Sequence, residues 1–385
     1  MTAEEINSWL IADARKSGDS VAIVEGFAQR LIDAGVPLWR ARVAQRLSNP
    51  LLAAWGVIWT PEETVDYTVP ITVLQTGTWF GSPFEYVTRT LQPLQKSLVD
   101  LDPERDHATY IELAEAGGTD FFATVLEYGD GSTQGCSFVS NVTGGFSQSH
   151  IDLIQSCRHA LAAALEAAAM RRSSESLLRT YLGAGPAKAV SEGTINRGEL
   201  TRIDAVVMIT DMRDFTRKSR EWNERDLLQA LDQYFEIVVD AVHKNGGDVL
   251  KFMGDGVLSV FPISDSCPTE ECCHNATVAA QQMLAALDDL NAERRKDAKE
   301  PLAFGTGIHS GTVTYGNIGS PDRLDFTVMG QAVNLASRIQ DLCKILGTPV
   351  LATHEVAHSS SDTYSSLGTH TVRGLDDPVE VFAFR

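Results

Sequence analysis

The chain has 385 residues, with 51 Asp and Glu against 32 Lys and Arg, so its formal net charge at pH 7 is −19. This length predicts about two or three domains, enough to bury at least one sizeable core. The acidic excess argues against a protein that follows a nucleic-acid backbone or binds an anionic membrane, because both need clustered basic residues. We therefore expect no nucleic-acid and no membrane partner.

Targeting and redox signals are weak in this sequence. Its apolar stretches fall short of the ~20 residues that span a bilayer, and its first residues lack the basic and apolar segments of a secretory signal. We expect a cytoplasmic location and reduced thiols, since six unevenly spaced cysteines make no disulfide framework. The cluster of Cys267, Cys272, Cys273 and His274 lacks the paired spacing of a zinc site and is interpreted as part of a helix.

The first half of the chain begins with a predicted helical segment, which is followed by predicted strands. Residues 1–60 predict a helical segment, because apolar side chains such as Val24, Phe27 and Leu31, then Val43 and Leu47, recur at helical spacing. From Thr68 the composition favours strands, at 69–74, 121–128 and 135–140. A Tyr-Gly-Asp-Gly turn at 128–131 predicts a hairpin between the last two strands.

A long helix is expected to begin at Ser147 or Ser149 and to continue towards Tyr181. Its apolar stripe is narrow, which predicts one of two arrangements: a coiled coil with a second copy, or a core helix that ends near Met170. The polar, glycine-containing segment 183–201 then marks a boundary, and a new domain begins near Arg202.

The second half alternates strands and helices. An apolar strand at 205–209 is followed by a helix through Leu227 and Val242, a hairpin over 248–261, and a helix over 269–295. A glycine-punctuated strand pair at 304–317, a helix at 331–346 and terminal strands complete the chain. This order predicts an α+β domain with a mixed or antiparallel sheet.

Two aspartates lie at strand ends in this half. Asp211 follows the strand 205–209, and Asp255 lies in the Gly-Asp-Gly turn of the hairpin. If the two strands are neighbours, both carboxylates meet at one edge and provide the oxygen ligands that Mg²⁺ or Mn²⁺ prefers. Taken alone, an aspartate in such a turn is simply a good turn residue.

Three further polar residues suit a nucleotide. Lys251 lies within an apolar strand, where its ammonium group either reaches solvent or faces a ligand. Asn334 and Arg338 are one helical turn apart, so they point the same way beside the apolar stripe of their helix. An amide and a guanidinium in this arrangement suit a sugar and a phosphate, although a solvated face is the default interpretation.

Four ordered motifs resemble the class III nucleotidyl cyclase catalytic domain, from about Arg202 to the end of the chain. They are Asp211-Met-Arg-Asp-Phe-Thr, Lys251-Phe-Met-Gly-Asp-Gly, Gly307-Ile-His-Ser-Gly and Phe326-Thr-Val-Met-Gly-Gln-Ala-Val-Asn-Leu-Ala-Ser-Arg. The hairpin near Gly129, followed by Gly144-Gly-Phe-Ser and a helix, is similar to a GAF sensory domain. We therefore expect a GAF-like α+β domain at 61–150, to which the helices of 1–60 also contribute, a connecting helix and linker at 151–201, and a ferredoxin-like cyclase domain at 202–385.

The resemblance implies a role for each matching residue. Asp211, Asp255 and the Met212 carbonyl would hold two Mg²⁺ or Mn²⁺ ions, and Phe215, Thr216 and Arg373 would contact substrate. Lys251 and Thr327 occupy the purine-selecting positions, in a combination that suits ATP. Asn334 would orient the ribose, and Arg338 would stabilise charge on the α-phosphate.

In this family the metal-binding aspartates and the purine, ribose and arginine contacts come from different chains. A homodimer with two composite sites is therefore implied. The sequence departs from the family at Asp214, where glycine is common, and at Thr312, where certain members have a phosphate-binding arginine.

The resulting hypothesis is an adenylate cyclase that makes cyclic AMP and pyrophosphate and is regulated by its N-terminal half. The alternatives are a guanylate cyclase and a catalytically degenerate nucleotide-sensing module. A small-molecule effector could bind the N-terminal half. Trp55, Trp59, Trp79 and Phe80 either line such a pocket or belong to an aromatic core.

Overall fold

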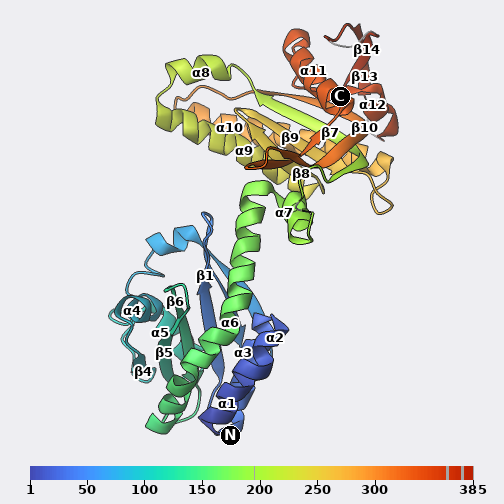
Figure 1. Ribbon diagram of the computed structural model, residues 1–385. Helices are drawn as coiled ribbons and strands as arrows, with labels where there is room; N and C mark the ends of the chain where they lie inside the picture. Colours follow the sequence, from blue (N-terminus) through green and yellow to red (C-terminus); the bar gives the residue numbers. More distant parts are fainter. Residues whose placement is uncertain (195, 361–363, 374–376, 385) are drawn as a thin grey trace. The chain divides into compact units, whose positions relative to one another are not determined.

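The computed structural model describes residues 1–194, 196–360, 364–373 and 377–384. The chain separates into two compact units, Met1–Thr180 and Tyr181–Arg385. Figure 1 shows both units as ribbons. In the described part of the chain, no helix is long and apolar enough to cross a membrane.

The first unit is built on an antiparallel sheet with strand order β3-β2-β1-β6-β5-β4. Its strands are β1 (Arg40–Arg46), β2 (Leu52–Trp59), β3 (Thr64–Pro70), β4 (Leu94–Ser97), β5 (Asp120–Glu127) and β6 (Thr133–Ser140). The predicted strands at 121–128 and 135–140 are confirmed, and so is the hairpin between them. The sheet therefore places residues of one strand alternately on its two faces.

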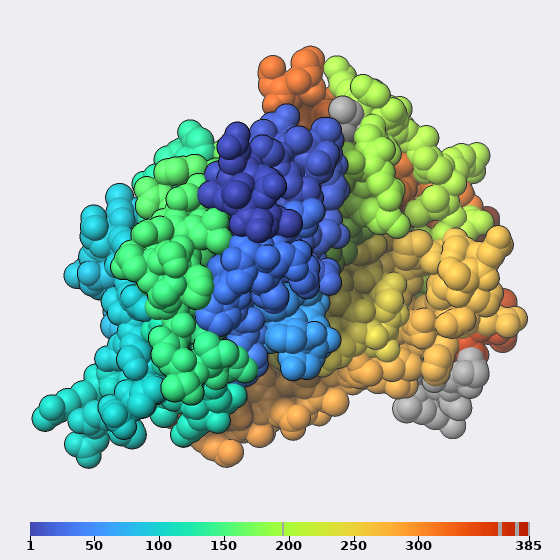
Figure 2. Space-filling model, turned by 90° about the horizontal axis from the view of Figure 1, so that it is seen from below, coloured from blue at the N-terminus to red at the C-terminus, as the bar shows by residue number. Residues whose placement is uncertain are grey.

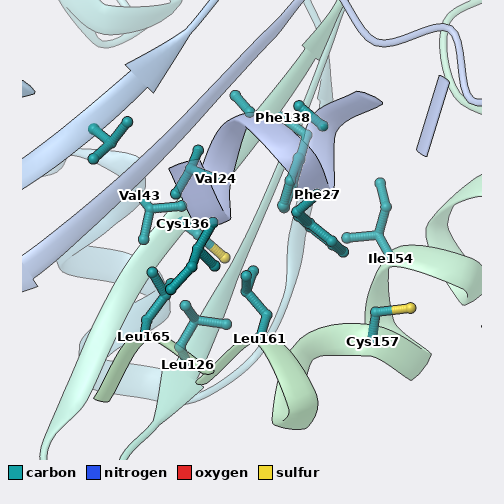
Figure 3. Close-up of a cluster of buried hydrophobic side chains, with 14 of the residues drawn as sticks. Val24, Phe27, Val43, Leu126, Cys136, Phe138, Ile154, Cys157, Leu161 and Leu165 are labelled. Atoms are coloured by element: carbon teal, nitrogen blue, oxygen red, sulfur yellow. The ribbon is translucent and has the colours of Figure 1, made fainter. Parts of the chain in front are cut away.

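One face of this sheet carries the main core of the unit. Phe122 and Leu126 of β5 and Phe138 of β6 are buried there against helices. The helical elements are α1 (Ala3–Trp9), a π-helical turn (Leu10–Ala14), α2 (Arg15–Ser17), α3 (Ser20–Asp33) and α6 (Gln148–Leu182). Figure 3 shows side chains of α3 and α6 meeting those of the strands, and Figure 2 shows the blue N-terminal helices beside green α6 at the surface.

The opposite face carries a smaller core. Phe121 and Ala123 of β5 and Val139 of β6 pack there with Val87 and Tyr110. The last two residues belong to α4 (Pro83–Thr90) and α5 (Ala108–Glu115). A 3₁₀ helix, η2 (Ile71–Gln75), follows β3.

The prediction of a helical segment over 1–60 was wrong for its second half. Residues 40–46 and 52–59 form β1 and β2. Val43 is buried as part of the period-2 pattern of β1, in which Ala41 and Gln45 are also buried, and the buried Leu47 follows directly after the strand. Because positions four apart share a face in both a helix and a strand, this spacing did not separate the two structures.

Helix α6 extends from Gln148 to Leu182, as the long-helix prediction required, so the alternative that ends near Met170 was wrong. Met170, Leu177 and Tyr181 are exposed to 38%, 38% and 72% on its C-terminal part. These three residues follow a spacing of seven and four, which is typical of a coiled-coil seam.

The second unit has a mixed sheet with strand order β13-β14-β12-β10-β7-β9-β8, and β11 pairs with β10. The strands are β7 (Leu200–Met212), β8 (Asp248–Met253), β9 (Gly256–Pro262), β10 (Phe304–Gly319), β11 (Leu324–Met329), β12 (Val350–Thr353), β13 (Tyr364–His370) and β14 (Val379–Phe384). The pairing of β10 with β12 is parallel and the other pairings are antiparallel, which confirms the α+β class with a mixed sheet.

Helices cover both faces of the central strands. Side chains of α9 (Glu224–Lys244) and α10 (Thr269–Lys296) share one core with β7, β9 and β10, and α11 (Gln331–Leu346) packs on the other face. Three short helices complete the unit: α7 (Ala184–Ser191), α8 (Phe215–Glu221) and α12 (His354–Ser359). The predicted helices at 269–295 and 331–346 are confirmed, whereas 304–319 is one continuous strand and not a strand pair.

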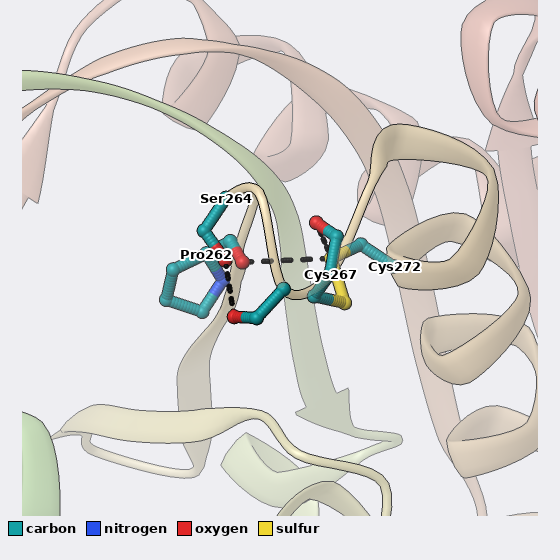
Figure 4. Close-up of a disulfide and its surroundings, with 5 residues drawn as sticks. Pro262, Ser264, Cys267 and Cys272 are labelled. Carbon is teal, nitrogen blue, oxygen red and sulfur yellow. Dashed lines mark hydrogen bonds between the residues drawn. A yellow bond between two sulfur atoms is a disulfide. The ribbon is translucent and has the colours of Figure 1, made fainter.

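The expectation of reduced thiols was wrong at one place. Cys267 and Cys272 form a disulfide at the start of α10, with Cα atoms 6.0 Å apart. Figure 4 shows the turn after β9 that brings the two residues together. Cys136, Cys157, Cys273 and Cys343 are free and buried.

Candidate active site

Asp211 and Asp255 lie at one edge of the second sheet. Asp211 is next to last in β7, and its backbone is paired with Gly256 of β9 and Gly305 of β10. Asp255 occupies the two-residue turn between β8 and β9, in which Gly254 has φ of +68°. This positive φ suits a tight hairpin and brings the Asp255 carboxylate beside that of Asp211.

The two carboxylates interact strongly. The pKa of Asp211 is raised to about 6, chiefly by burial and then by the negative charge of Asp255. Arg213 opposes this rise, whereas Asp341 adds to it. The site is therefore a concentration of negative charge that favours a cation.

A cavity of about 560 Å³ opens over this pair. Met212, Phe215 and Thr216 line it together with both aspartates, so the structure brings these five predicted site residues together. Arg217, Arg220 and Lys344 add positive charge to its wall. A cavity that joins paired carboxylates to basic side chains suits a ligand with both a metal ion and phosphate groups.

Asp214 follows in the same wall and adopts φ of +59°. It precedes the first residue of α8, and in the part of the chain described here its side chain makes no capping hydrogen bond. Glycine adopts this left-handed conformation without strain. The backbone conformation therefore gives a physical reason to expect glycine at this position, where the present chain has Asp214.

A second group of predicted residues lies on β8 and β11. The ammonium of Lys251 donates to the Asp325 carboxylate over 2.6 Å, and both side chains are partly exposed. This contact is the chief reason that the pKa of Asp325 is lowered. Thr327 is two residues along β11 from Asp325, so both lie on the same face of the strand.

The helix α11 presents Asn334 and Arg338, which are both exposed. The Arg338 guanidinium is 3.3 Å from the carboxylate of Asp341, one turn further along the helix. Of the described residues, Gln340, Asp341 and Lys344 of this helix line the aspartate cavity, and Asn334 and Arg338 do not. Within one chain, the predicted residues therefore divide among the aspartate cavity, the Lys251–Asp325 contact of β8 and β11, and the exposed face of α11.

Arg373 and Thr312 lie outside the aspartate cavity among the described residues. Arg373 is exposed after β13, and no described contact joins it to the other predicted site residues. Thr312 donates to Asp204 over 2.5 Å on the neighbouring strand, so its hydroxyl already has a partner.

The sequence interpretation missed Asp325 and Asp341. Asp325 precedes Phe326 by one residue, and its role as the partner of Lys251 follows from the approach of β11 to β8. Asp341 is one helical turn after Arg338, a spacing that favours an ion pair and could have identified it.

The donor set fits a divalent metal. No group of three or more His, Cys, Asp or Glu side chains capable of holding an ion occurs among the described residues. Mg²⁺ in nucleotide sites is held through one or two carboxylates, with substrate phosphates and water as the other ligands. Asp211, Asp255 and the Met212 carbonyl match that requirement.

Comparison with known proteins identifies this half of the chain. Residues 200–384 match the family model of the adenylate and guanylate cyclase catalytic domain. Adenylate cyclase 1 of Rhizobium meliloti is 28% identical over 199 residues, which are 51% of this chain and 29% of that protein. Adenylate cyclase of Anabaena cylindrica is 32% identical over 179 residues, which are 46% of this chain and 34% of that protein. The matched region therefore spans about a third of these relatives.

Solved structures also align with the chain. The adenylyl cyclase CyaB from P. aeruginosa is 26% identical, with a TM-score of 0.43 and coverage of 49% of this chain and 96% of that one. For the guanylyl cyclase Cya2 the identity is 28%, the TM-score 0.42, and the coverage 47% and 91%. On the match of its four motifs and of the family model, the segment 200–384 belongs to the class III adenylate and guanylate cyclase catalytic domain family.

Proposed function

We propose that this protein is an adenylate cyclase that converts ATP to 3′,5′-cyclic AMP and pyrophosphate. The observation that carries the proposal is the pairing of Asp211 with Asp255 in a cavity that also contains basic side chains. In the reaction, the ribose 3′-oxygen forms a bond to the α-phosphorus while the bond from that phosphorus to the oxygen bridging to the β-phosphate breaks. Pyrophosphate leaves, and the hydroxyl proton passes to solvent.

Asp211, Asp255 and the Met212 carbonyl would hold two Mg²⁺ or Mn²⁺ ions. Bound there, such ions would lower the pKa of the 3′-hydroxyl and neutralise triphosphate charge. Phe215 and Thr216, at the start of α8, would line the path of the triphosphate. Their position in the same cavity as the aspartates supports this role.

Lys251 would donate to adenine N1, and Thr327 would accept from the exocyclic amine. Asp325 supports this assignment, because its carboxylate restrains an ammonium group that would otherwise move freely on a long side chain. Asn334 would orient the ribose, Arg338 would stabilise charge on the α-phosphate, and Arg373 would contact the outer phosphates.

The active unit would be a homodimer with composite sites. Among the described residues of one chain, Asn334 and Arg338 do not line the aspartate cavity, and Arg338 is ion-paired with Asp341 at its edge. A second copy could supply these groups to the aspartates of the first. The exposed Phe252, Met253 and Met329, at the ends of β8 and β11, are apolar surface that such a partner would cover.

The N-terminal unit, which we assign as a GAF-like sensory domain, would regulate catalysis through α6. This helix is continuous from Gln148 to Leu182 and exposes Met170, Leu177 and Tyr181 at coiled-coil spacing. Pairing of two α6 helices would align two cyclase domains, and a change in that pairing would alter their fit.

The test is to incubate the purified chain with Mn²⁺ and either ATP or GTP and to separate the products. Formation of cyclic AMP in preference to cyclic GMP is expected. The reverse preference would assign a guanylate cyclase, and nucleotide binding without turnover in Mg²⁺ and in Mn²⁺ would assign a sensing module. Asp211→Asn provides the control for contaminating activity, because it removes a metal ligand with little change in shape.

A further inference from the structure

The N-terminal unit contains a cavity of about 450 Å³ on the sheet face opposite α6. Strands β1, β2 and β6 form its floor, and the end of β3 together with the segment from η2 to α4 forms its wall. Its volume lies in the range of small-molecule sites. Trp79 lines it, whereas Trp55 and Trp59 belong to the core on the other face and Phe80 is 58% exposed.

The floor of this cavity is basic although the unit is acidic. Acidic residues outnumber basic ones in residues 1–180. Arg42 and Arg46 nevertheless line the floor of the cavity, and Arg40 lies on the same face of β1, since all three alternate with the core residues of the strand. The pKa of Arg40 is lowered, first by burial and then by the positive charge of Arg42, so the strand face carries crowded positive charge.

Arg42 is held in a fixed position. Its guanidinium carbon is 4.6 Å from the ring centroid of Tyr67 and 4.6 Å from that of Phe84. Two glycines make room for these rings: a Cβ at Gly56 would lie 2.5 Å from the Tyr67 hydroxyl, and a Cβ at Gly135 would lie 2.5 Å from Phe84 Cδ1. The sheet is therefore shaped to place two aromatic rings about one arginine.

This arrangement leaves the end of the guanidinium free. Arg42 Nε donates to the Tyr67 hydroxyl over 2.6 Å, which leaves both terminal nitrogens available for a forked pair of hydrogen bonds. In the described part of the chain, neither Arg42 nor Arg46 has a carboxylate partner. Glu85 lines the cavity too, but its carboxylate accepts from Gly81 N–H and lies 3.7 Å from Arg89.

One part of the wall is apolar. Val69, Val73, Leu74 and Trp79 form it, beside the polar side chains of Thr78, Ser82 and Thr88. Such a wall can cover a flat or branched hydrocarbon body while the arginines hold an anionic group. An inorganic anion alone would leave this wall without a contact.

We propose that this cavity binds a small organic anion, whose carboxylate or phosphate pairs with Arg42 and Arg46 and whose apolar body packs on Val73, Leu74 and Trp79. The inference concerns binding by the N-terminal unit. It does not depend on whether the cyclase domain makes cyclic AMP or cyclic GMP.

Calorimetric titration of the full chain tests it, with 2-naphthoate and 2-naphthyl phosphate as probes and 2-naphthamide as the neutral match. Both anions should bind. Naphthamide should bind at least about tenfold more weakly, because it cannot form charge-assisted hydrogen bonds. The two anions distinguish a carboxylate from a phosphate as the preferred group. Quenching of tryptophan fluorescence by the bound probe should disappear in Trp79→Phe, which would place the probe at this wall.

Variants of the basic floor complete the test. Arg42→Gln should weaken naphthoate binding by about tenfold. Arg46 is exposed, so Arg46→Gln tests the basic floor even if Arg42→Gln folds poorly, and it should weaken binding by about threefold or more. Arg105→Gln is the matched control, because Arg105 is an exposed arginine beside Asp102 and away from the cavity. Equal affinity for naphthoate and naphthamide, unchanged affinity in both cavity variants, or no binding of either anion at millimolar concentration would overturn the proposal.

Discussion

Asp214→Gly tests how an unusual residue in the proposed triphosphate loop affects stability and nucleotide affinity. Asp214 has φ of +59°, lines the aspartate cavity and is exposed. The substitution removes a side chain from a left-handed backbone position and a negative charge from the cavity wall. Stability and nucleotide affinity should therefore both increase.

The magnitudes follow from the geometry. A left-handed conformation costs a non-glycine residue about 1–2 kcal/mol, and the extra freedom of glycine in the unfolded chain offsets about 0.5–1 kcal/mol of this. A net gain of about 0.5–1 kcal/mol should raise the melting temperature of a domain of this size by about 1–4 °C. Removing one exposed charge near the triphosphate should lower the KM for ATP by about two- to fivefold, and less at high salt.

Two controls divide these effects, measured by calorimetry and by steady-state kinetics. Asp214→Asn removes the charge and keeps a residue that tolerates positive φ, so it should lower KM with little change in melting temperature. Ala298→Gly relieves a similar backbone, with φ of +54°, outside the site and should change only the melting temperature. A lower melting temperature for Asp214→Gly, or a KM unchanged in both Asp214 variants, would refute the reasoning.

Three further predictions address other parts of the chain. Asp325→Asn should raise the KM for ATP severalfold with little effect on melting temperature, because the Lys251–Asp325 pair is about 40% exposed and such pairs contribute about 0–1 kcal/mol; an unchanged KM would remove Asp325 from substrate recognition. Leu177→Glu should shift the chain from dimer to monomer in analytical ultracentrifugation and abolish activity, since it places charge on the exposed seam of α6, whereas an active dimer would argue against that seam. The pKa of Glu355 is lowered to about 2, chiefly by His309, so the stability it contributes is present above its ordinary value of 4.5 and is lost as the pH falls towards 2. Glu355→Gln should therefore flatten the pH dependence of the unfolding free energy over that interval, and an unaltered slope in acid denaturation would contradict this assignment.

Local patterns predicted much of the second unit. The apolar stripe of 331–346 and the Gly-Asp-Gly turn of the hairpin each specify structure within a few residues, and both elements formed as expected. The same holds for the meeting of Asp211 and Asp255, which required only that β7 and β9 be neighbours.

Features that depend on distant contacts were not predictable. Val43 shares its spacing with both a helix and a strand, and only pairing with β2 and β6 decides the outcome. The Lys251–Asp325 pair joins residues 74 positions apart. The packing of the Tyr67 and Phe84 rings on Arg42 depends on glycines in two other strands. Such contacts arise from tertiary packing, which no short sequence window contains.

Complementation between two inactive variants tests the central claim, a cyclase with composite sites. Asp211→Asn and Arg338→Ala should each abolish cyclic AMP formation alone. Mixed in equal amounts, they should form dimers of which about half are mixed, each with one intact site, and so recover about a quarter of wild-type activity. If mixed dimers, isolated through two different tags, make no cyclic AMP, the two groups of residues do not meet across a dimer and the account is contradicted.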